Sequence, residues 1–147
     1  MNNLINEIDF SKILIADSEL ALAEAVRTHL VQSCFISREK TFIAKEGIEI
    51  IQLLVRERIG NVLLSHMLLD YLGEEHLLAF LKKLDCENRK LVFWLNLDQD
   101  WRFAEIIIKA NLQNKYPIFS KNGGIKNFSK TIWLEFPGIF HSTSCGI

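Results

Sequence analysis

The chain has 147 residues, of which 49% are hydrophobic and 24% are charged, and its 17 basic and 18 acidic side chains leave a formal net charge of -1. This length suits one domain with a full core, and a separate output domain would not fit beside it. The balanced charge argues against binding to nucleic acid or to anionic membranes, because both need a basic excess on the protein surface. We therefore expect one globular domain whose partners are neither nucleic acid nor membrane.

Three cysteines, Cys34, Cys86 and Cys145, are widely spaced and odd in number. They predict neither a disulfide framework nor a CxxC-type metal site, so we interpret them as reduced thiols. The first residues lack the basic and apolar regions of a signal peptide, and no apolar run approaches the roughly 18 residues of a membrane span. These features favour a cytoplasmic protein.

Five short apolar runs predict strands that are buried on both faces. In chain order they are residues 12–16, 41–44, 61–65, 90–95 and 116–120. Apolar residues at helical spacing predict five helices, around residues 20–30, 48–55, 77–81, 103–110 and 125–132. Strands that alternate with helices indicate an α/β fold with a doubly wound, five-stranded parallel sheet. We place this domain at residues 11–135, with an N-terminal extension at 1–10 and a C-terminal tail at 136–147.

Polar residues follow four of the predicted strands. Asp17 and Ser18 follow the first strand, Ser65 ends the third, Asn96 follows the fourth and Lys121 follows the fifth. In doubly wound sheets, function gathers outside the carboxyl ends of the strands. We therefore expect these five side chains to form the candidate site.

Two stretches of the sequence resemble the receiver domain of two-component response regulators. KILIADSE, at residues 12–19, is similar to the first strand of a receiver and its acidic exit, and AKEGIEII, at 44–51, is similar to the start of its second helix. The resemblance covers roughly residues 11 to 134. It implies a flavodoxin-like sheet in the strand order 2-1-3-4-5.

The other motifs of a receiver follow in order. Receivers carry a proline four residues and a glycine eight residues after the phosphoaccepting aspartate, and counting from Ser65 places Leu69 and Gly73 there. PIFSKN, at residues 117–122, is similar to the fifth receiver strand, so the resemblance assigns Lys121 to the family's phosphate-contacting lysine. Asn96 falls where receivers have Thr or Ser.

The resemblance also shows what this sequence lacks. Receiver phosphorylation requires a nucleophilic carboxylate on the third strand and Mg²⁺ held by acidic residues, and Mg²⁺ binds through hard oxygen ligands. Here Ser65 stands at the nucleophile, and Ser18 replaces one member of the acidic pair, so that only Asp17 remains. Asn96 and Ile118 occupy the two positions through which receivers switch. We therefore interpret the sequence as a degenerate pseudo-receiver that is not an enzyme and has no metal or cofactor.

Three further readings concern residues near Ser65. A Ser65–His66 nucleophile pair is disfavoured, because successive strand residues point to opposite faces. Asp70, in the loop expected after the third strand, is an alternative phosphate acceptor, although it lies five residues too far along the chain. For Lys121 we favour an ion pair with Asp17 across the former phosphate pocket.

Aromatic residues suggest where such a protein acts. Receivers form dimers and bind outputs through their fourth helix, fifth strand and fifth helix, and the resemblance extends that surface to this chain. Trp101, Trp133 and Phe136 are the interface candidates, because aromatic anchors are enriched at interface centres. The preferred hypothesis is a phosphorylation-independent interaction module in bacterial signalling, which binds a protein partner or a second copy. The alternative is a small-ligand-binding or catalytic module that uses the pocket around Asp17, Ser65 and Lys121.

Overall fold

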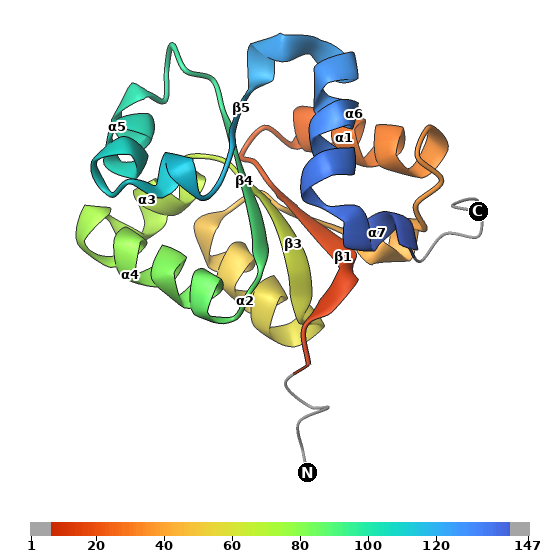
Figure 1. The fold of residues 1–147 in the computed structure, drawn as a ribbon, viewed down its shortest axis with the longest axis horizontal. Helices are drawn as coiled ribbons and strands as arrows, with labels where there is room; N and C mark the ends of the chain where they lie inside the picture. Colours follow the sequence, from red (N-terminus) through yellow and green to blue (C-terminus); the bar gives the residue numbers. More distant parts are fainter. Residues whose placement is uncertain (1–6, 142–147) are drawn as a thin grey trace.

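A computed structural model describes residues 7–141, without the side chains of 123–127, 140 and 141. Its five strands form one parallel sheet in the order β2-β1-β3-β4-β5, which confirms the expected fold class and topology (Figure 1). The strands are β1 (Asp9–Ala16), β2 (Thr41–Ala44), β3 (Ile59–Leu64), β4 (Lys90–Leu95) and β5 (Ile118–Ser120).

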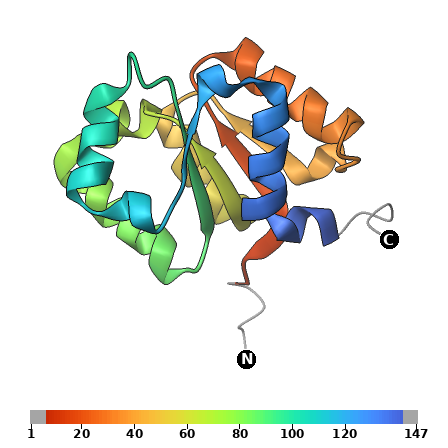
Figure 2. The same cartoon turned by 45° about the horizontal axis from the view of Figure 1, so that its top comes forward.

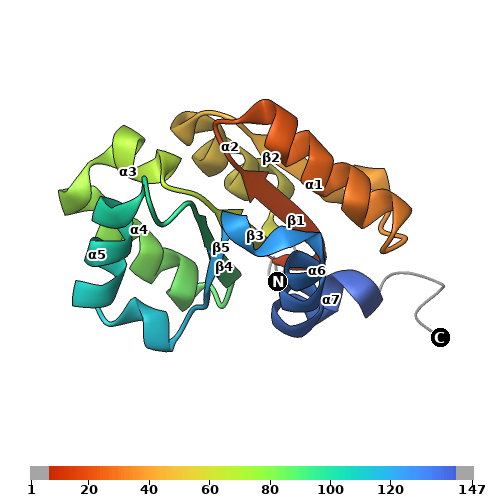
Figure 3. The ribbon, with the colours of Figure 1, turned by 90° about the horizontal axis from the view of Figure 1, so that it is seen from above.

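Helices cover both faces of this sheet. They are α1 (Leu20–Gln32), α2 (Gly47–Glu57), α3 (Met67–Leu72), α4 (Glu74–Cys86), α5 (Trp101–Lys109), α6 (Gly124–Glu135) and α7 (Pro137–His141), with short 3-10 turns η2 (Arg38–Lys40), η3 (Leu112–Asn114) and η4 (Lys121–Gly123). Figure 3 shows α4 and α5 on one side of the sheet and α1 and α6 on the other. No helix in this described part of the chain is long and apolar enough to cross a membrane.

The alternation of side chains along the strands divides the core into two layers. On one face, Leu14 and Phe93 pack with buried residues of α2, α4 and α5. On the other face, Ile13, Ile15 and Trp94 pack with α1, α6 and α7. Because β3, β4 and the second half of β1 are almost fully buried, the apolar runs of these strands are continuous rather than alternating.

Two short helices were not expected from the sequence. α3 occupies the segment after β3 that we expected to be a loop, so Asp70 lies on a helix. α7 lies within residues 136–147, which we expected to be a tail, and it packs against β1 (Figure 2). The described residues therefore contain seven α-helices where five were predicted. A six-residue and a five-residue helix are too short to show a clear apolar period.

Glycine allows α7 to approach β1. A Cβ atom on Gly138 would lie 2.6 Å from the carbonyl oxygen of Phe10, and one on Gly60 would lie 2.6 Å from its Cδ1. Both contacts are closer than real Cβ atoms make, so Phe10 lies between two positions that have room for glycine only. Phe136 and Ile139 are each 0% exposed and belong to the core beside α1 and α6. The end of the predicted domain at residue 135 therefore falls inside the core.

The fifth strand begins later than its apolar run predicted. The ladder between β4 and β5 starts at the pair Phe93 and Ile118, and the N–H of Phe93 donates to the carbonyl of Pro117 at 3.0 Å. Pro117 has no N–H to extend the ladder toward the start of β4. Residues 90–92 of β4 are therefore paired with β3 alone.

Candidate functional site

The five residues of the candidate site lie at the carboxyl edge of the sheet. Asp17 and Ser18 follow β1, Ser65 follows β3, Asn96 follows β4 and Lys121 follows β5. Asp17 and Ser65 are each 0% exposed, and the Lys121 side chain is 9% exposed. Ser18 is exposed instead, at the surface of this edge.

An ion pair joins the first and fifth strands at this edge. The Nζ atom of Lys121 lies 2.7 Å from Oδ2 of Asp17, although the angles fall outside those of a regular hydrogen bond. The same ammonium lies 5.2 Å from the ring centroid of Trp94, within cation–π range. The ion pair that the sequence suggested between Lys121 and Asp17 is therefore confirmed.

Local backbone contacts position the Asp17 carboxylate. Its Oδ1 accepts a hydrogen bond of 2.9 Å from the N–H of Glu19, which closes a turn before α1. The N–H of Asp17 itself donates to the carbonyl of Ala44 at 3.0 Å, beyond the last pair of β1 and β2. The carboxylate is thus held by the chain on one side and by Lys121 on the other.

Ser65 is buried without a base beside it. Its N–H donates to the carbonyl of Ala16 at 3.1 Å, and its Oγ has no hydrogen-bond partner among the described residues. The imidazole of His66 lies near Asp100 and Asp70, with nitrogen–oxygen distances of 3.2 and 3.7 Å. A serine hydroxyl needs an adjacent base to act as a nucleophile at neutral pH, and no described side chain supplies one.

Asp100 organises this edge and was not among the candidates from the sequence. It is 7% exposed, and its Oδ2 accepts a hydrogen bond of 2.8 Å from the N–H of Asn96. Its own N–H donates to the carbonyl of Asn96 at 2.7 Å, and its Oδ1 faces His66. Asp100 therefore ties the start of α5 to the end of β4 and to the segment after β3. The only signal in the sequence was its place directly before the predicted helix.

The two switch positions are held by local contacts. The side-chain oxygen of Asn96 accepts a hydrogen bond of 3.3 Å from the N–H of Asp98. Ile118 is half-buried and packs against the core layer that contains Phe93. Neither residue carries the hydroxyl or aromatic ring that the receiver resemblance assigns to these places.

The residues at this edge do not fit a magnesium ion. Asp17 is the one carboxylate left from the expected ligands, and the ammonium of Lys121 already lies against its Oδ2. Asp70 is 74% exposed, and its carboxylate lies 3.7 Å from the imidazole of His66. Within the described residues, no group of three or more His, Cys, Asp or Glu side chains could hold a metal ion.

The interface candidates divide into exposed and buried residues. Trp101 and Trp133 are 62% and 55% exposed, as an interface role requires. Phe136 is fully buried in the core, so the prediction that it lies at an interface is wrong for this fold. Its aromatic character serves packing between α1, α6 and the sheet.

Trp101 belongs to a larger apolar surface on α5, which we call the α5 face. Leu97, just before the helix, and Ile108, within it, are 45% and 55% exposed and line the same groove as Trp101. The apolar residues of this face recur at helical spacing. They lie one position along the chain from the buried residues Phe103, Ile106 and Ile107. The α5 face forms a groove of about 560 Å³ lined by Leu97, Trp101, Ala104, Glu105, Ile108 and Lys109.

Comparisons with known proteins agree with this architecture. No family model and no curated protein sequence matches the chain. The solved structures that it resembles include the receiver domain of Francisella response regulator 1452, with 20% identity and a TM-score of 0.61, covering 86% of this chain and 96% of that one.

Two further receiver structures give the same picture. The signal receiver domain of an HD domain-containing protein from Pseudomonas fluorescens Pf-5 is 15% identical, with a TM-score of 0.63 and coverage of 89% and 98% of the two chains. The receiver domain of AraT, a response regulator from Geobacillus stearothermophilus, is 18% identical, with a TM-score of 0.60 and coverage of 88% and 95%. At these identities the likeness concerns the fold, and the chain has the fold of response-regulator receiver domains.

Proposed function

We propose that the chain is a phosphorylation-independent pseudo-receiver, a cytoplasmic protein-interaction module of bacterial two-component-type signalling or regulation without catalysis of its own. The observation that carries this proposal is the ion pair between Lys121 and Asp17 at 2.7 Å. In a receiver, the resemblance assigns the lysine to the phosphoryl group. Here the lysine already has an anionic partner, and Ser65 stands where the phosphoryl group would be attached.

The ion pair supports one fixed conformation of the domain. Lys121 begins the segment after β5, and Asp17 begins the segment after β1, so their contact closes the edge without any ligand. Two buried charges that neutralise each other are costly to separate, because either one alone would remain desolvated. A domain held in this way presents the same surface at all times.

Phosphorylation assays test this proposal directly. We expect no covalent label on the wild-type chain after incubation with radiolabelled acetyl phosphate and Mg²⁺. The double variant S18D/S65D returns two carboxylates to the edge, and we expect it to bind Mg²⁺ and to take up label. A competent receiver domain is the control for the assay, and stoichiometric labelling of the wild-type chain would overturn the proposal.

The α5 face supports a protein partner, and we extend the proposal to a second copy of this chain. Glu105 and Lys109 border the apolar groove and lie 3.9 Å apart as an exposed ion pair. If two α5 helices crossed in antiparallel orientation, each Glu105 would face Lys109 of the second copy, so the surface is complementary to itself. In Figure 1, β5 runs between α5 and α6, and the resemblance assigns these three elements to the surface that receivers use.

Sedimentation analysis tests this part of the proposal. We expect a dimer whose dissociation constant rises at least about tenfold in Trp101→Lys, since a buried charge would disrupt the apolar contact. Val55→Lys is the matched control, because Val55 is 69% exposed on α2, away from the α5 face. A wild-type chain that stays monomeric at high concentration would contradict the homodimer.

The alternative function, a ligand-binding or catalytic pocket at Asp17, Ser65 and Lys121, has less support. The lysine that would attract an anion is paired, and the serine has no base. The labelling experiment does not detect this alternative, because an anion that displaces Asp17 without forming a covalent bond leaves no label. Protection of the Lys121 ammonium from acetylation by inorganic phosphate would favour it.

A further inference from the structure

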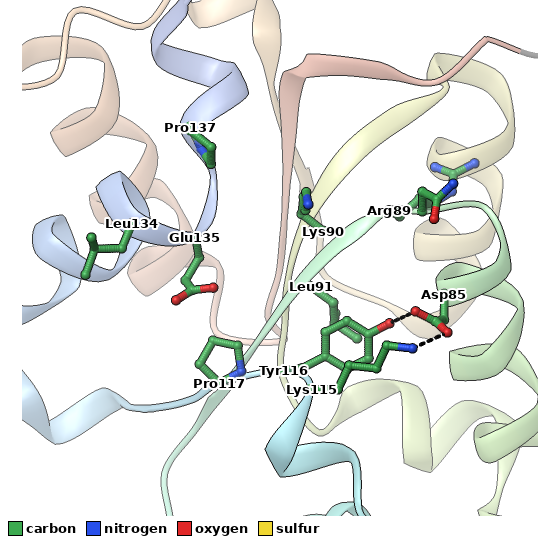
Figure 4. A pocket seen from close by; sticks show the side chains of 11 residues that line it. Asp85, Arg89, Lys90, Leu91, Lys115, Tyr116, Pro117, Leu134, Glu135 and Pro137 are labelled. Atoms are coloured by element: carbon green, nitrogen blue, oxygen red, sulfur yellow. Dashed lines mark hydrogen bonds and ion pairs between the residues drawn. The ribbon is translucent and has the colours of Figure 1, made fainter.

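A second cavity lies at the opposite, amino edge of the sheet. It has a volume of about 360 Å³ and lies between the start of β4, the segment before β5 and the end of α6 (Figure 4). This volume falls in the range of about 300 to 1,000 Å³ that is usual for small-molecule sites. None of the five predicted site residues lines it.

The short fifth strand creates this cavity. Leu91 has the same orientation in β4 as Phe93, whose N–H bonds to Pro117, so the N–H and carbonyl of Leu91 also point toward the β5 side. The residue that would bond to the carbonyl of Leu91 is Pro117, which has no N–H. No backbone hydrogen bond joins Leu91 to residues 115–117 in the described chain. One donor and one acceptor of the backbone therefore border the cavity without a strand partner.

Most charges around the cavity are already paired. The carboxylate of Asp85 accepts hydrogen bonds from Lys115 at 2.5 Å and from the Tyr116 hydroxyl at 2.6 Å. These bonds hold the pKa of Asp85 below its ordinary value, while burial and the bond to Asp85 raise the pKa of Tyr116. The guanidinium of Arg89 is buried and donates to Glu87 and to the carbonyl of Ile59. This group of residues forms a fixed wall.

Two charges of opposite sign remain. Lys90, at the start of β4, and Glu135, at the end of α6, both line the cavity and have no charged partner among the described residues. Figure 4 shows Glu135 on the α6 side of the opening, across from the wall formed by Asp85, Lys115 and Tyr116. Apolar surface from Leu91, Pro117 and Leu134 lies around these charges.

We propose that this cavity binds a small zwitterion with one ammonium and one carboxylate. The ligand is either a free α-amino acid or a dipeptide with both termini charged. Lys90 attracts the carboxylate and Glu135 attracts the ammonium, so that a ligand with only one charge leaves one protein charge unpaired. The backbone of Leu91 adds a carbonyl that can accept a hydrogen bond from the ligand ammonium and an N–H that can donate one to the ligand carboxylate. The apolar walls favour an aliphatic side chain such as that of leucine.

Calorimetry with four probes tests the proposal: leucine, N-acetyl-leucine, leucinamide and the dipeptide leucyl-leucine. We expect leucine or the dipeptide to bind saturably, and the tighter of the two identifies the source of the zwitterion. N-acetyl-leucine lacks the ammonium and leucinamide lacks the carboxylate. Each should bind at least about tenfold more weakly, which corresponds to about 1.4 kcal/mol.

Variants then assign each charge to its residue. Glu135→Gln should weaken leucine about tenfold and leave N-acetyl-leucine unchanged, whereas Lys90→Gln should weaken leucine and leave leucinamide unchanged. Lys82→Gln is the control, because Lys82 is an exposed lysine of α4 that does not line the cavity. Absence of saturable binding by leucine and by the dipeptide would overturn the proposal. Equal affinity for the charged and the blocked probes, or variants that change nothing, would also overturn it.

Discussion

At the carboxyl edge of the sheet, the ammonium of Lys121 lies 2.7 Å from Asp17, and both side chains are buried. At the amino edge, Lys90 and Glu135 border a cavity without a charged partner among the described residues. The receiver resemblance assigns chemistry to the first edge, yet the pair of opposite charges that have no ion-pair partner in the described part of the chain borders the second. We therefore base the proposed ligand site on charge pairing rather than on position in a familiar fold.

The largest expected effect comes from breaking the buried pair. Asp17→Asn leaves the Lys121 ammonium without its counter-charge at 9% exposure, and we expect a loss of about 3 to 5 kcal/mol in the free energy of unfolding. Urea denaturation measures this loss. The double variant D17N/K121M removes both charges and should recover most of it.

A control at the amino edge sharpens the same contrast. Lys115→Met removes one partner of an ion pair whose lysine and aspartate side chains are 54% and 39% exposed. Water can solvate the remaining carboxylate, so this variant should change stability far less than Asp17→Asn. Similar losses of unfolding free energy in Lys115→Met and Asp17→Asn would show that burial does not make the pair at the carboxyl edge more important for stability.

An intermediate effect is expected where α7 meets the start of β1. Gly138→Ala places a Cβ atom 2.6 Å from the carbonyl oxygen of Phe10, and a backbone oxygen cannot move aside as a side chain can. We expect a loss of about 1 to 3 kcal/mol in urea denaturation. Lys130→Ala, at an exposed position of α6, provides the comparison and should be nearly neutral. A Gly138→Ala variant as stable as wild type would mean that the close contact between α7 and Phe10 of β1 is not needed for stability.

The smallest effect concerns pH. The pKa of Asp85 is lower in the folded chain than its ordinary value, mainly through the hydrogen bonds from Lys115 and Tyr116. A lowered pKa stabilises the fold above the unfolded value of about 3.9, and this contribution is lost as the pH falls through the folded value. Asp85→Asn should therefore be less stable than wild type at about pH 6, and the gap should narrow below about pH 4. If the difference in stability between wild type and Asp85→Asn grew as the pH fell, the stabilising role given to the Asp85 carboxylate would be wrong.

Much of the architecture could be predicted because continuous apolar runs mark buried strands. The runs around Ile13, Val62 and Phe93 all form strands, and their order defines the sheet. The contact between Asp17 and Lys121 could also be anticipated, since topology brings the ends of the first and fifth strands to the same edge. Both inferences depend only on pattern and topology.

Other features depend on tertiary contacts that sequence patterns do not show. Phe136 was assigned to a surface because nothing local distinguishes a buried aromatic from an exposed one. Asp100 was missed because its partners, Asn96 and His66, come from the ends of different strands. The cavity at the amino edge depends on Pro117 facing Leu91, a relation that exists only once the register of β4 and β5 is known.

The contact of α7 with β1 also has a consequence for synthesis on the ribosome. β1 is an interior strand of the sheet and is synthesised early. Phe10, at its start, is nevertheless covered by Gly138, which is synthesised after all five strands. Until α7 emerges, the core around Phe136 and Ile139 is open on the side of α1 and α6. The domain therefore completes its core only after α7 has left the exit tunnel, so β1 waits for the last described helix before its packing is final.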